Sequence, residues 1–315
     1  SQRPIPNLTN VIAETGSVLS TPGDISFSID ATASNSKLYV ANAGANTVLS
    51  FTLSPIPRPT AAVGTVAFGT GASPATAPVL APAALSGARS LVADGAGGLW
   101  IADLNNNRVF KLTIATGAVT TPFASTLPRG ITFNGQDALY LAEVSGGVGR
   151  IRRYDISTAT FTNIVTTGLS TTVSTILHDG GNPGNLFVCD AGNDRVKLVD
   201  LATNVVTNVV GGGAAVSDAV GTSIILDGPQ GLAYDGLRYL YISNAAATTS
   251  GRDIKQVDTL ASYYTRRFAG SGGTGTTTGY PGTSRTQQPQ GLAYDSYNNM
   301  LLNVDSAGNS FKIIQ

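Results

Sequence analysis

Two side chains in this sequence are obvious candidates for acid–base or nucleophilic chemistry, His178 and Cys189, and each is the only residue of its type. A catalytic zinc takes about three protein ligands. Because the chain has one histidine, a site built from three histidines is impossible. No G-x-S-x-G segment marks a serine nucleophile. A single histidine can still serve as a general base. We therefore predict no catalytic residue, and His178 is the candidate only if the protein is an enzyme.

Both residues also have a structural interpretation. His178 lies in the segment STILHD, where it matches Tyr234 and Tyr294 of two related segments. This match favours a packed residue or one at the end of a strand. Cys189 lies in LFVCD, at a position where the related segments carry Ala, Ser or Val. That pattern is typical of a small buried residue rather than a nucleophile.

Composition excludes several classes of partner. Charged residues make up 12% of the chain, and the 19 basic and 19 acidic residues cancel. An average soluble domain has about 25% charged residues. No basic run exists to attract a phosphate backbone, so no nucleic-acid partner is expected. The one cysteine allows no intrachain disulfide. No apolar run approaches the roughly 18 residues of a membrane helix, so no membrane span is expected.

The heptapeptide PQGLAYD occurs twice, starting at Pro229 and at Pro289. Aligning the chain on it gives six related units, which is the signature of a repeat protein. Their first strands are predicted at ISFSID, RSLVAD, RGITFN, STILHD and two copies of QGLAYD, starting near residues 25, 89, 129, 174, 230 and 290. These starts lie 64, 40, 45, 56 and 60 residues apart. Such spacings suit the blades of a propeller with some enlarged loops.

Each unit contains further short strands. The second strands are predicted at LYVAN, LWIAD, LYLAE, LFVCD, LYISN and LLNVD, and a third strand follows each. Fourth strands are predicted near residues 64–69, 118–123, 160–165, 204–210 and 263–268, whereas the sixth unit ends without one. Residues 10–16 are similar to residues 204–211. We therefore expect residues 1–20 to supply the outer strand of the last blade and to close the ring.

The sequence thus predicts an all-β protein, a six-bladed β-propeller of four-stranded antiparallel blades that forms a single domain over residues 1–315. The segments PQGLAYD and GARSLVADGAGGLWIADLNNNRVFKL resemble NHL repeats. The resemblance, to the NHL-repeat family of six-bladed propellers, covers essentially the whole chain. That family and its relatives include amidating lyases with a histidine-held zinc, calcium-dependent lactonases and esterases, sensor domains and RNA-binding domains. The resemblance therefore implies a fold without selecting a function.

The resemblance also implies that the first strands line a central channel and that the residues opening them surround its mouth. These residues are Ile25 with Asp24 beside it, Arg89, Arg129, Ser174, Gln230 and Gln290. Two Arg and two Gln make a donor-rich, net positive opening that suits a carboxylate, a phosphate or sugar hydroxyls. We predict Arg89, Arg129, Gln230 and Gln290 as the ligand-binding residues.

Other interpretations of this mouth concern ion pairs and metals. Arg89 and Arg129 are alternatively expected to pair with Asp103 and Glu143, which end two of the second strands. Calcium takes six to eight oxygen ligands. Because only Asp24 is acidic at the mouth, neither a metal nor another cofactor is predicted.

Two further series recur once per unit. The residues that end the second strands are Asn42, Asp103, Glu143, Asp190, Asn244 and Asp305, which we interpret as caps of the following turn. Aromatic residues at Tyr39, Trp100, Tyr140, Phe187 and Tyr241 are interpreted as packing between blades. Long loops at residues 70–87, 211–228 and 270–288 are either tolerated insertions or a binding surface above the channel.

These observations favour a non-enzymatic recognition or interaction module that binds a polar or anionic small molecule, a glycan or a protein partner at its top face and channel mouth. We expect it to act as a monomer or within a larger assembly. The Lys-poor, Thr- and Ser-rich composition fits an extracellular or cell-surface location. The start at Ser1 fits a processed form or a fragment. The alternative is a propeller enzyme, a lyase or hydrolase whose site is not recognisable from the sequence.

Overall fold

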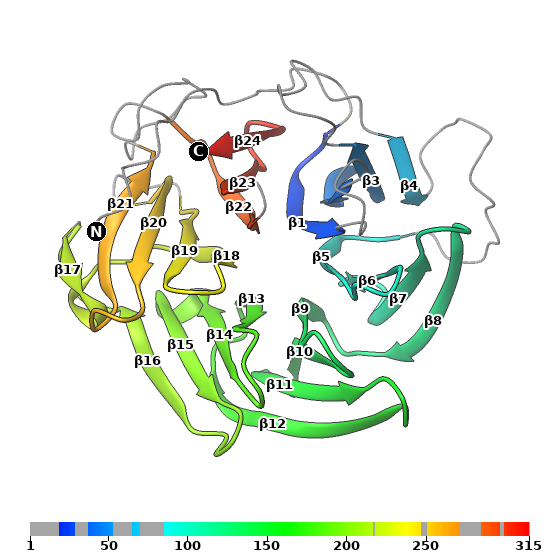
Figure 1. Cartoon of the computed structure of the whole chain (residues 1–315), viewed down its shortest axis with the longest axis horizontal. Helices are drawn as coiled ribbons and strands as arrows, with labels where there is room; N and C mark the ends of the chain where they lie inside the picture. Colours follow the sequence, from blue (N-terminus) through cyan, green and yellow to red (C-terminus); the bar gives the residue numbers. More distant parts are fainter. Residues whose placement is uncertain are drawn as a thin grey trace.

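Six antiparallel sheets surround a common centre in the computed structural model (Figure 1). The structure describes residues 19–28, 37–52, 65–69, 85–216, 218–246, 251–270, 285–296 and 299–314. Four sheets have four strands, one has five, and the last has three within the described residues. The predicted six-bladed β-propeller is therefore confirmed. The closing strand is expected at residues 1–20, of which 1–18 lie outside the described residues, as do most of the loops at 70–87 and 270–288.

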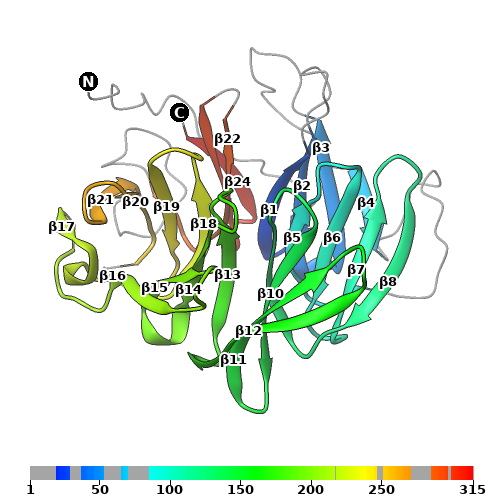
Figure 2. The ribbon, with the colours of Figure 1, turned by 60° about the horizontal axis from the view of Figure 1, so that its bottom comes forward.

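Successive strands of each blade run from the centre outwards. The inner strands of blades 1 to 6 are, in this order, β1 (Pro22–Ser28), β5 (Ala88–Ala93), β9 (Pro128–Phe133), β13 (Val173–His178), β18 (Pro229–Tyr234) and β22 (Pro289–Asp295). The second strands are β2 (Lys37–Asn42), β6 (Gly98–Asp103), β10 (Ala138–Ser145), β14 (Asn185–Asp190), β19 (Tyr239–Asn244) and β23 (Met300–Asp305). Figure 2 shows β1, β5, β13 and β18 near the middle of the molecule.

The outer half of each blade is formed by two more strands. The third strands are β3 (Thr47–Thr52), β7 (Arg108–Thr113), β11 (Val148–Asp155), β15 (Arg195–Asp200), β20 (Asp253–Asp258) and β24 (Ser310–Ile314). The fourth strands are β4 (Thr65–Gly69), β8 (Ala118–Ala124), β12 (Thr160–Leu169), β16 (Val206–Gly211) and β21 (Tyr264–Ala269). Blade 5 gains a fifth strand, β17 (Ala219–Val220), which the sequence did not predict. Three short 3₁₀ helices complete the elements: η1 (Ala43–Ala45), η2 (Ala191–Asn193) and η3 (Gly221–Ser223).

Burial follows position within the blade. Every residue of β6 is buried, because neighbouring strands cover its edges and neighbouring blades cover its faces. A fully buried strand needs apolar residues on both faces, which is why GLWIAD shows no simple alternation. The outer strand β8 is mostly half-buried or exposed, and its sequence is correspondingly rich in Thr.

Aromatic side chains pack one blade against the next, as the sequence predicted. Their ring centroids lie 5.7 Å apart for Tyr140 and His178, and 6.0 Å apart for Tyr241 and Tyr294. In both pairs, the first ring comes from a second strand and the other from the inner strand of the following blade. The penultimate residue of the heptapeptide therefore contributes to the packing between blades.

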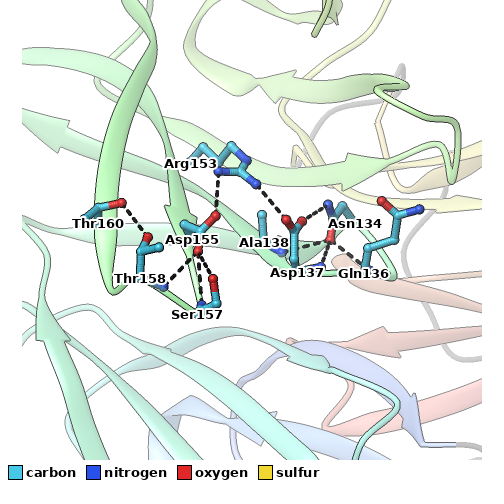
Figure 3. Close-up of polar contacts among 9 residues, drawn as sticks. All are labelled: Asn134, Gln136, Asp137, Ala138, Arg153, Asp155, Ser157, Thr158 and Thr160. Atoms are coloured by element: carbon cyan, nitrogen blue, oxygen red, sulfur yellow. Dashed lines mark hydrogen bonds and ion pairs between the residues drawn. The ribbon is translucent and has the colours of Figure 1, made fainter.

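The last residue of the heptapeptide caps the turn between the first and second strands. Asp235 Oδ1 accepts hydrogen bonds from three backbone N–H groups of its turn, at 2.7–2.9 Å. In blade 3, Asn134 Oδ1 accepts three such bonds at 3.0 Å (Figure 3). Asp and Asn favour this arrangement because their short side chains reach the backbone a few residues ahead.

A second turn lies at the same end of blade 3, between β11 and β12. Asp155 Oδ1 accepts from the hydroxyl and the backbone N–H of Ser157 and from the N–H of Thr158 (Figure 3). These hydrogen bonds hold the pKa of Asp155 below its ordinary value. Arg153 joins the two turns, since its guanidinium lies 3.2 Å from both Asp137 and Asp155. The polar contacts of Figure 3 therefore have a structural role.

The carboxylates that end the second strands have two tasks. Asp103 Oδ2 accepts from Asn106 Nδ2 at 2.7 Å, which caps the following turn as expected. Its Oδ1 accepts from the backbone N–H of Ser86 at 2.8 Å and so holds the loop that enters the inner strand. Asp190 repeats the arrangement with Asn193 and Ser170, each at 2.8 Å. The sequence predicted the cap but missed the contact with the loop.

Buried lysines pair with two of the carboxylates that end second strands, and in blade 5 with Asp253, which begins the third strand. Lys197, Lys255 and Lys312 occupy one register position of the third strands. Their Nζ atoms lie 2.8–3.0 Å from Asp190, Asp253 and Asp305, respectively. Lys255 and Lys312 also donate to backbone carbonyls of incoming loops, at 3.0 Å and 2.7 Å. Buried cations of this kind need both a counter-charge and further hydrogen bonds.

Candidate functional site

Strand pairing fixes which residues are equivalent at the channel mouth. Each inner strand has one Ile or Leu that pairs with the middle of the second strand: Ile25, Leu91, Ile131, Ile176, Leu232 and Leu292. The residues two positions earlier are Gly23, Arg89, Arg129, Ser174, Gln230 and Gln290. The assignment of Ile25 to the mouth was therefore wrong by two residues. Blade 1 has no Arg or Gln at this position, which concealed the correct alignment, and its register irregularity between Pro22 and Asp24 recurs at the equivalent place in the other blades.

Arg89 and Gln230 meet across the ring. Arg89 Nη2 donates to Gln230 Oε1 at 2.5 Å, although 141 residues separate them in sequence. Arg89 belongs to blade 2 and Gln230 to blade 5, and Figure 1 shows β5 and β18 on opposite sides of the centre. The hydrogen bond therefore spans the channel at the level where the inner strands begin.

The two mouth arginines have no carboxylate partner within the described residues. The expected pairing with Asp103 and Glu143 is wrong, because those carboxylates bind other arginines. Asp103 pairs with Arg108 at 3.4 Å, and Glu143 pairs with two of the three arginines of β11, Arg150 and Arg152. The third-strand cations are closer to these carboxylates because they lie directly opposite or diagonally across the adjoining strand.

The electrostatic environment of the mouth reflects this lack of partners. Burial lowers the pKa of Arg89, the positive charge of Arg129 lowers it further, and Asp24 partly opposes both effects. Burial also lowers the pKa of Arg129. Arg129 Nε and Gln290 Oε1 are buried without a hydrogen-bond partner in the described part of the chain. The mouth therefore combines excess positive charge with unused hydrogen-bonding capacity.

Directly beyond the mouth, the channel contains a cavity of about 200 Å³. All six inner strands line it, through residues that follow the mouth positions along each strand. Asp24 is the only carboxylate among the lining residues. Asp24 Oδ2 accepts from Ser90 Oγ at 2.6 Å and from the N–H of Leu91 at 3.2 Å. Burial nevertheless raises the pKa of Asp24 to about 6.

His178 lies away from the mouth, at the far end of β13. Its Nδ1 accepts a hydrogen bond from the N–H of Gly180 at 3.0 Å, so Nε2 carries the proton that it donates to the carbonyl of Pro183 at 3.1 Å. The imidazole is buried and stacked on Tyr140. Because both ring nitrogens are occupied, this arrangement does not present a free base to a substrate.

Cys189 is fully buried in β14. Burial raises the pKa of its thiol well above the ordinary value, so little of the reactive thiolate forms near neutral pH. In the part of the chain that the structure describes, no three His, Cys, Asp or Glu side chains gather as a metal site. No helix among the described residues is long and apolar enough to cross a membrane.

No family model and no curated protein matches this sequence. Solved structures do resemble the fold. An auxiliary nutrient binding protein from Bacteroides thetaiotaomicron has a TM-score of 0.71 and 17% identity over 93% of this chain and 69% of its own. A protein of the same description from Bacteroides ovatus has a TM-score of 0.71 and 13% identity over 93% and 68%. Virginiamycin B lyase from Staphylococcus aureus has a TM-score of 0.56 and 14% identity over 98% and 97%. At such low identity these likenesses show that the chain has a β-propeller fold, and the fold alone.

Proposed function

We propose that this chain is a binding propeller that takes a small anionic ligand at its channel mouth through Arg89, Arg129, Gln230 and Gln290. The observation that carries the proposal is the presence of two neighbouring arginines at the mouth without a carboxylate partner among the described residues. Bringing a second cation into a half-buried site is unfavourable unless an anion compensates it. A bound carboxylate or phosphate would supply that charge.

The surroundings of these residues support a pre-formed site. Gly23 allows blades 1 and 2 to approach closely at the mouth, since a Cβ added there would lie 3.2 Å from the backbone oxygen of Arg89. Gln290 is 7% exposed, so its amide is held in place by its neighbours. Groups held rigidly before binding lose less entropy when a ligand arrives.

The comparisons are consistent with a binding role, since two similar structures are described as auxiliary nutrient binding proteins. We extend that role, an extracellular or cell-surface location and membership of the NHL-repeat propellers to this chain as parts of the same proposal. A structure of virginiamycin B lyase in which a histidine is replaced by alanine is described as catalytically inactive. Here both nitrogens of His178 are hydrogen-bonded. We therefore favour binding over lyase or hydrolase activity.

The test compares ligands that differ only in charge. Glucuronate and glucose should be titrated by calorimetry into the native protein and into Arg89→Ala, Arg129→Ala and the double variant. Glucuronate should bind in preference to glucose, and each single variant should weaken its binding by about tenfold to a hundredfold, as expected for a charge-assisted hydrogen bond. Acetate and inorganic phosphate provide two further anions.

Arg238→Ala is the matched control, because Arg238 lies on an exposed turn and pairs with Asp258. It should bind anions like the native protein. Binding that persists in the double variant, or a native protein that binds none of these anions, would overturn the proposal. Near-native circular dichroism of the variants separates a lost contact from a lost fold.

A further inference from the structure

An apolar belt lies immediately beyond the cationic mouth. The six equivalent residues Ile25, Leu91, Ile131, Ile176, Leu232 and Leu292 all line the channel cavity. Each comes from a different blade and stands two positions after a mouth residue. The repeat therefore builds a ring of Ile and Leu side chains beneath mouth positions that carry Arg in two blades and Gln in two others.

The size of the cavity limits what can enter it. Its volume of about 200 Å³ is somewhat larger than the roughly 150 Å³ apolar cavity that accommodates benzene in another protein. One phenyl ring or a branched alkyl group of similar size therefore fits inside it. The hydroxyls of Thr132 and Thr175, also in the lining, give the wall a few polar positions.

Charge limits the head group of the ligand. Arg89 and Arg129 contribute two positive charges at the mouth, and Asp24 contributes the one carboxylate of the cavity wall. With Asp24 ionised, the formal charge of this region is therefore +1, and a single carboxylate neutralises it. A dianion would leave an uncompensated negative charge beside Asp24, which is costly in a buried site.

Asp24 links the mouth to the cavity, although the mouth arginines and glutamines are not themselves among the residues that line the cavity. Asp24 lines the cavity and interacts electrostatically with Arg89, and its Oδ2 accepts from Ser90, the next residue along β5. The hydrogen bond from Arg89 to Gln230 crosses the ring between the two regions. Arg89 can exchange the neutral amide of Gln230 for a carboxylate, because a charged acceptor binds a guanidinium more strongly.

We infer that the ligand is a monocarboxylate with one compact apolar group, whose head pairs with Arg89 and Arg129 and whose apolar group fills the belt of the channel cavity. This inference rests on the proposed function, since it assigns a substrate class to the same mouth. It adds the cavity as the part of the site that provides selectivity.

The test compares acetate, phenylacetate and 2-phenylethanol by titration calorimetry with the native protein. Phenylacetate should bind about tenfold to a hundredfold more tightly than acetate, because burying a phenyl group is worth that much in affinity. The neutral 2-phenylethanol should bind at least about tenfold more weakly than phenylacetate, because it lacks the carboxylate. Equal affinities for acetate and phenylacetate would overturn the inference and leave the proposed function intact.

A cavity-filling variant provides an independent test. Ala293 lines the cavity, and Ala293→Leu should remove most of the preference for phenylacetate over acetate. Ala202→Leu, the same change on an exposed turn, should keep the preference. Binding of acetate by Ala293→Leu reports an intact mouth, so a loss of preference together with retained acetate binding supports the inference. An unchanged preference in Ala293→Leu would contradict it, and a native protein that binds neither carboxylate would refute the proposed function itself.

Discussion

Arg89 Nη2 lies 2.5 Å from Gln230 Oε1, in a hydrogen bond that joins opposite blades across the channel. Gln230 provides a neutral acceptor to a guanidinium that has no carboxylate partner among the described residues. The mouth is therefore polar and closed at its centre, but Asp24 compensates its positive charge only in part. Within the described part of the chain, Arg89 thus has a hydrogen-bond acceptor in Gln230 but no negatively charged one.

Gln230→Glu should stabilise the protein and block its mouth. The new carboxylate would pair with Arg89 and supply the missing negative charge, for a gain of about 1–2 kcal/mol in the free energy of unfolding. Anion affinity should fall at least about tenfold, because the internal carboxylate competes with the ligand. Denaturant unfolding and calorimetric titration check the two effects. Gln136→Glu on the exposed turn of blade 3 is the control, and destabilisation by Gln230→Glu alone would show that the mouth is not net positive.

Because of Asp24, the free energy of unfolding should decrease as the pH rises from about 4 to above 6. Burial raises the pKa of Asp24 from 3.8 to about 6, so the folded protein keeps this proton at pH values where the unfolded chain has lost it. The stabilising contribution is therefore complete below about pH 4 and is lost as the pH rises through about 6. The shift corresponds to about 3 kcal/mol at most.

Asp24→Asn removes this titration. The difference in unfolding free energy between the native protein and this variant should therefore fall as the pH rises from 4 to 7. Urea unfolding at several pH values measures that difference, in which the contributions of all other titrating groups cancel. Parallel stability profiles would show that Asp24 has the same pKa in both states.

Within the buried ion pair of Lys255 and Asp253, replacing the aspartate should destabilise the protein more than replacing the lysine. Both side chains are fully buried, and Arg267 Nε also lies 3.0 Å from Asp253. Asp253→Asn leaves the ammonium of Lys255 without its counter-charge and should cost about 3–5 kcal/mol. Lys255→Met should cost clearly less, because Arg267 still pairs with Asp253.

The double variant Asp253→Asn/Lys255→Met shows how far the effects of the two single substitutions on stability depend on each other. It should be more stable than Asp253→Asn alone, because no unpaired buried ammonium remains. Urea unfolding of the three variants gives the coupling energy. Simple addition of the two single losses would show that Lys255 and Asp253 do not depend on one another.

The proposed closure of the ring by residues 1–20 predicts that their removal exposes the last blade. Among the described residues, β24 is the edge strand of its sheet, paired with β23 only. Deletion of residues 1–18 should therefore lower the melting temperature by several degrees, and a synthetic peptide of that sequence should restore it. If residues 1–315 form one domain, the full chain should also unfold in a single transition. A deletion that leaves the melting temperature unchanged would contradict the closure.

Repetition in the sequence was sufficient to predict the fold. The heptapeptide appears twice because five of its residues have fixed tasks within a blade. Gln opens the inner strand at the mouth, Leu joins the apolar belt, Tyr packs between blades, and Asp caps the next turn. Its Gly allows a close approach, since a Cβ at Gly231 would lie 2.1 Å from the backbone oxygen of Gln290 in the following blade. Such tasks depend on local geometry and on one neighbouring blade, so they leave a regular pattern in the sequence.

The contacts that form the candidate site leave no such pattern in the sequence. The sequence named Arg89, Arg129, Gln230 and Gln290, but it paired the two arginines with the wrong carboxylates and placed Ile25 where Gly23 stands. It gave no sign that Arg89 reaches Gln230 or that Asp24 joins the mouth to a cavity. Local strand and turn preferences act over a few residues, whereas these contacts link blades 2, 5 and 1 around a ring. Only the register of each inner strand and the circular arrangement of the blades decide which side chains meet at the centre.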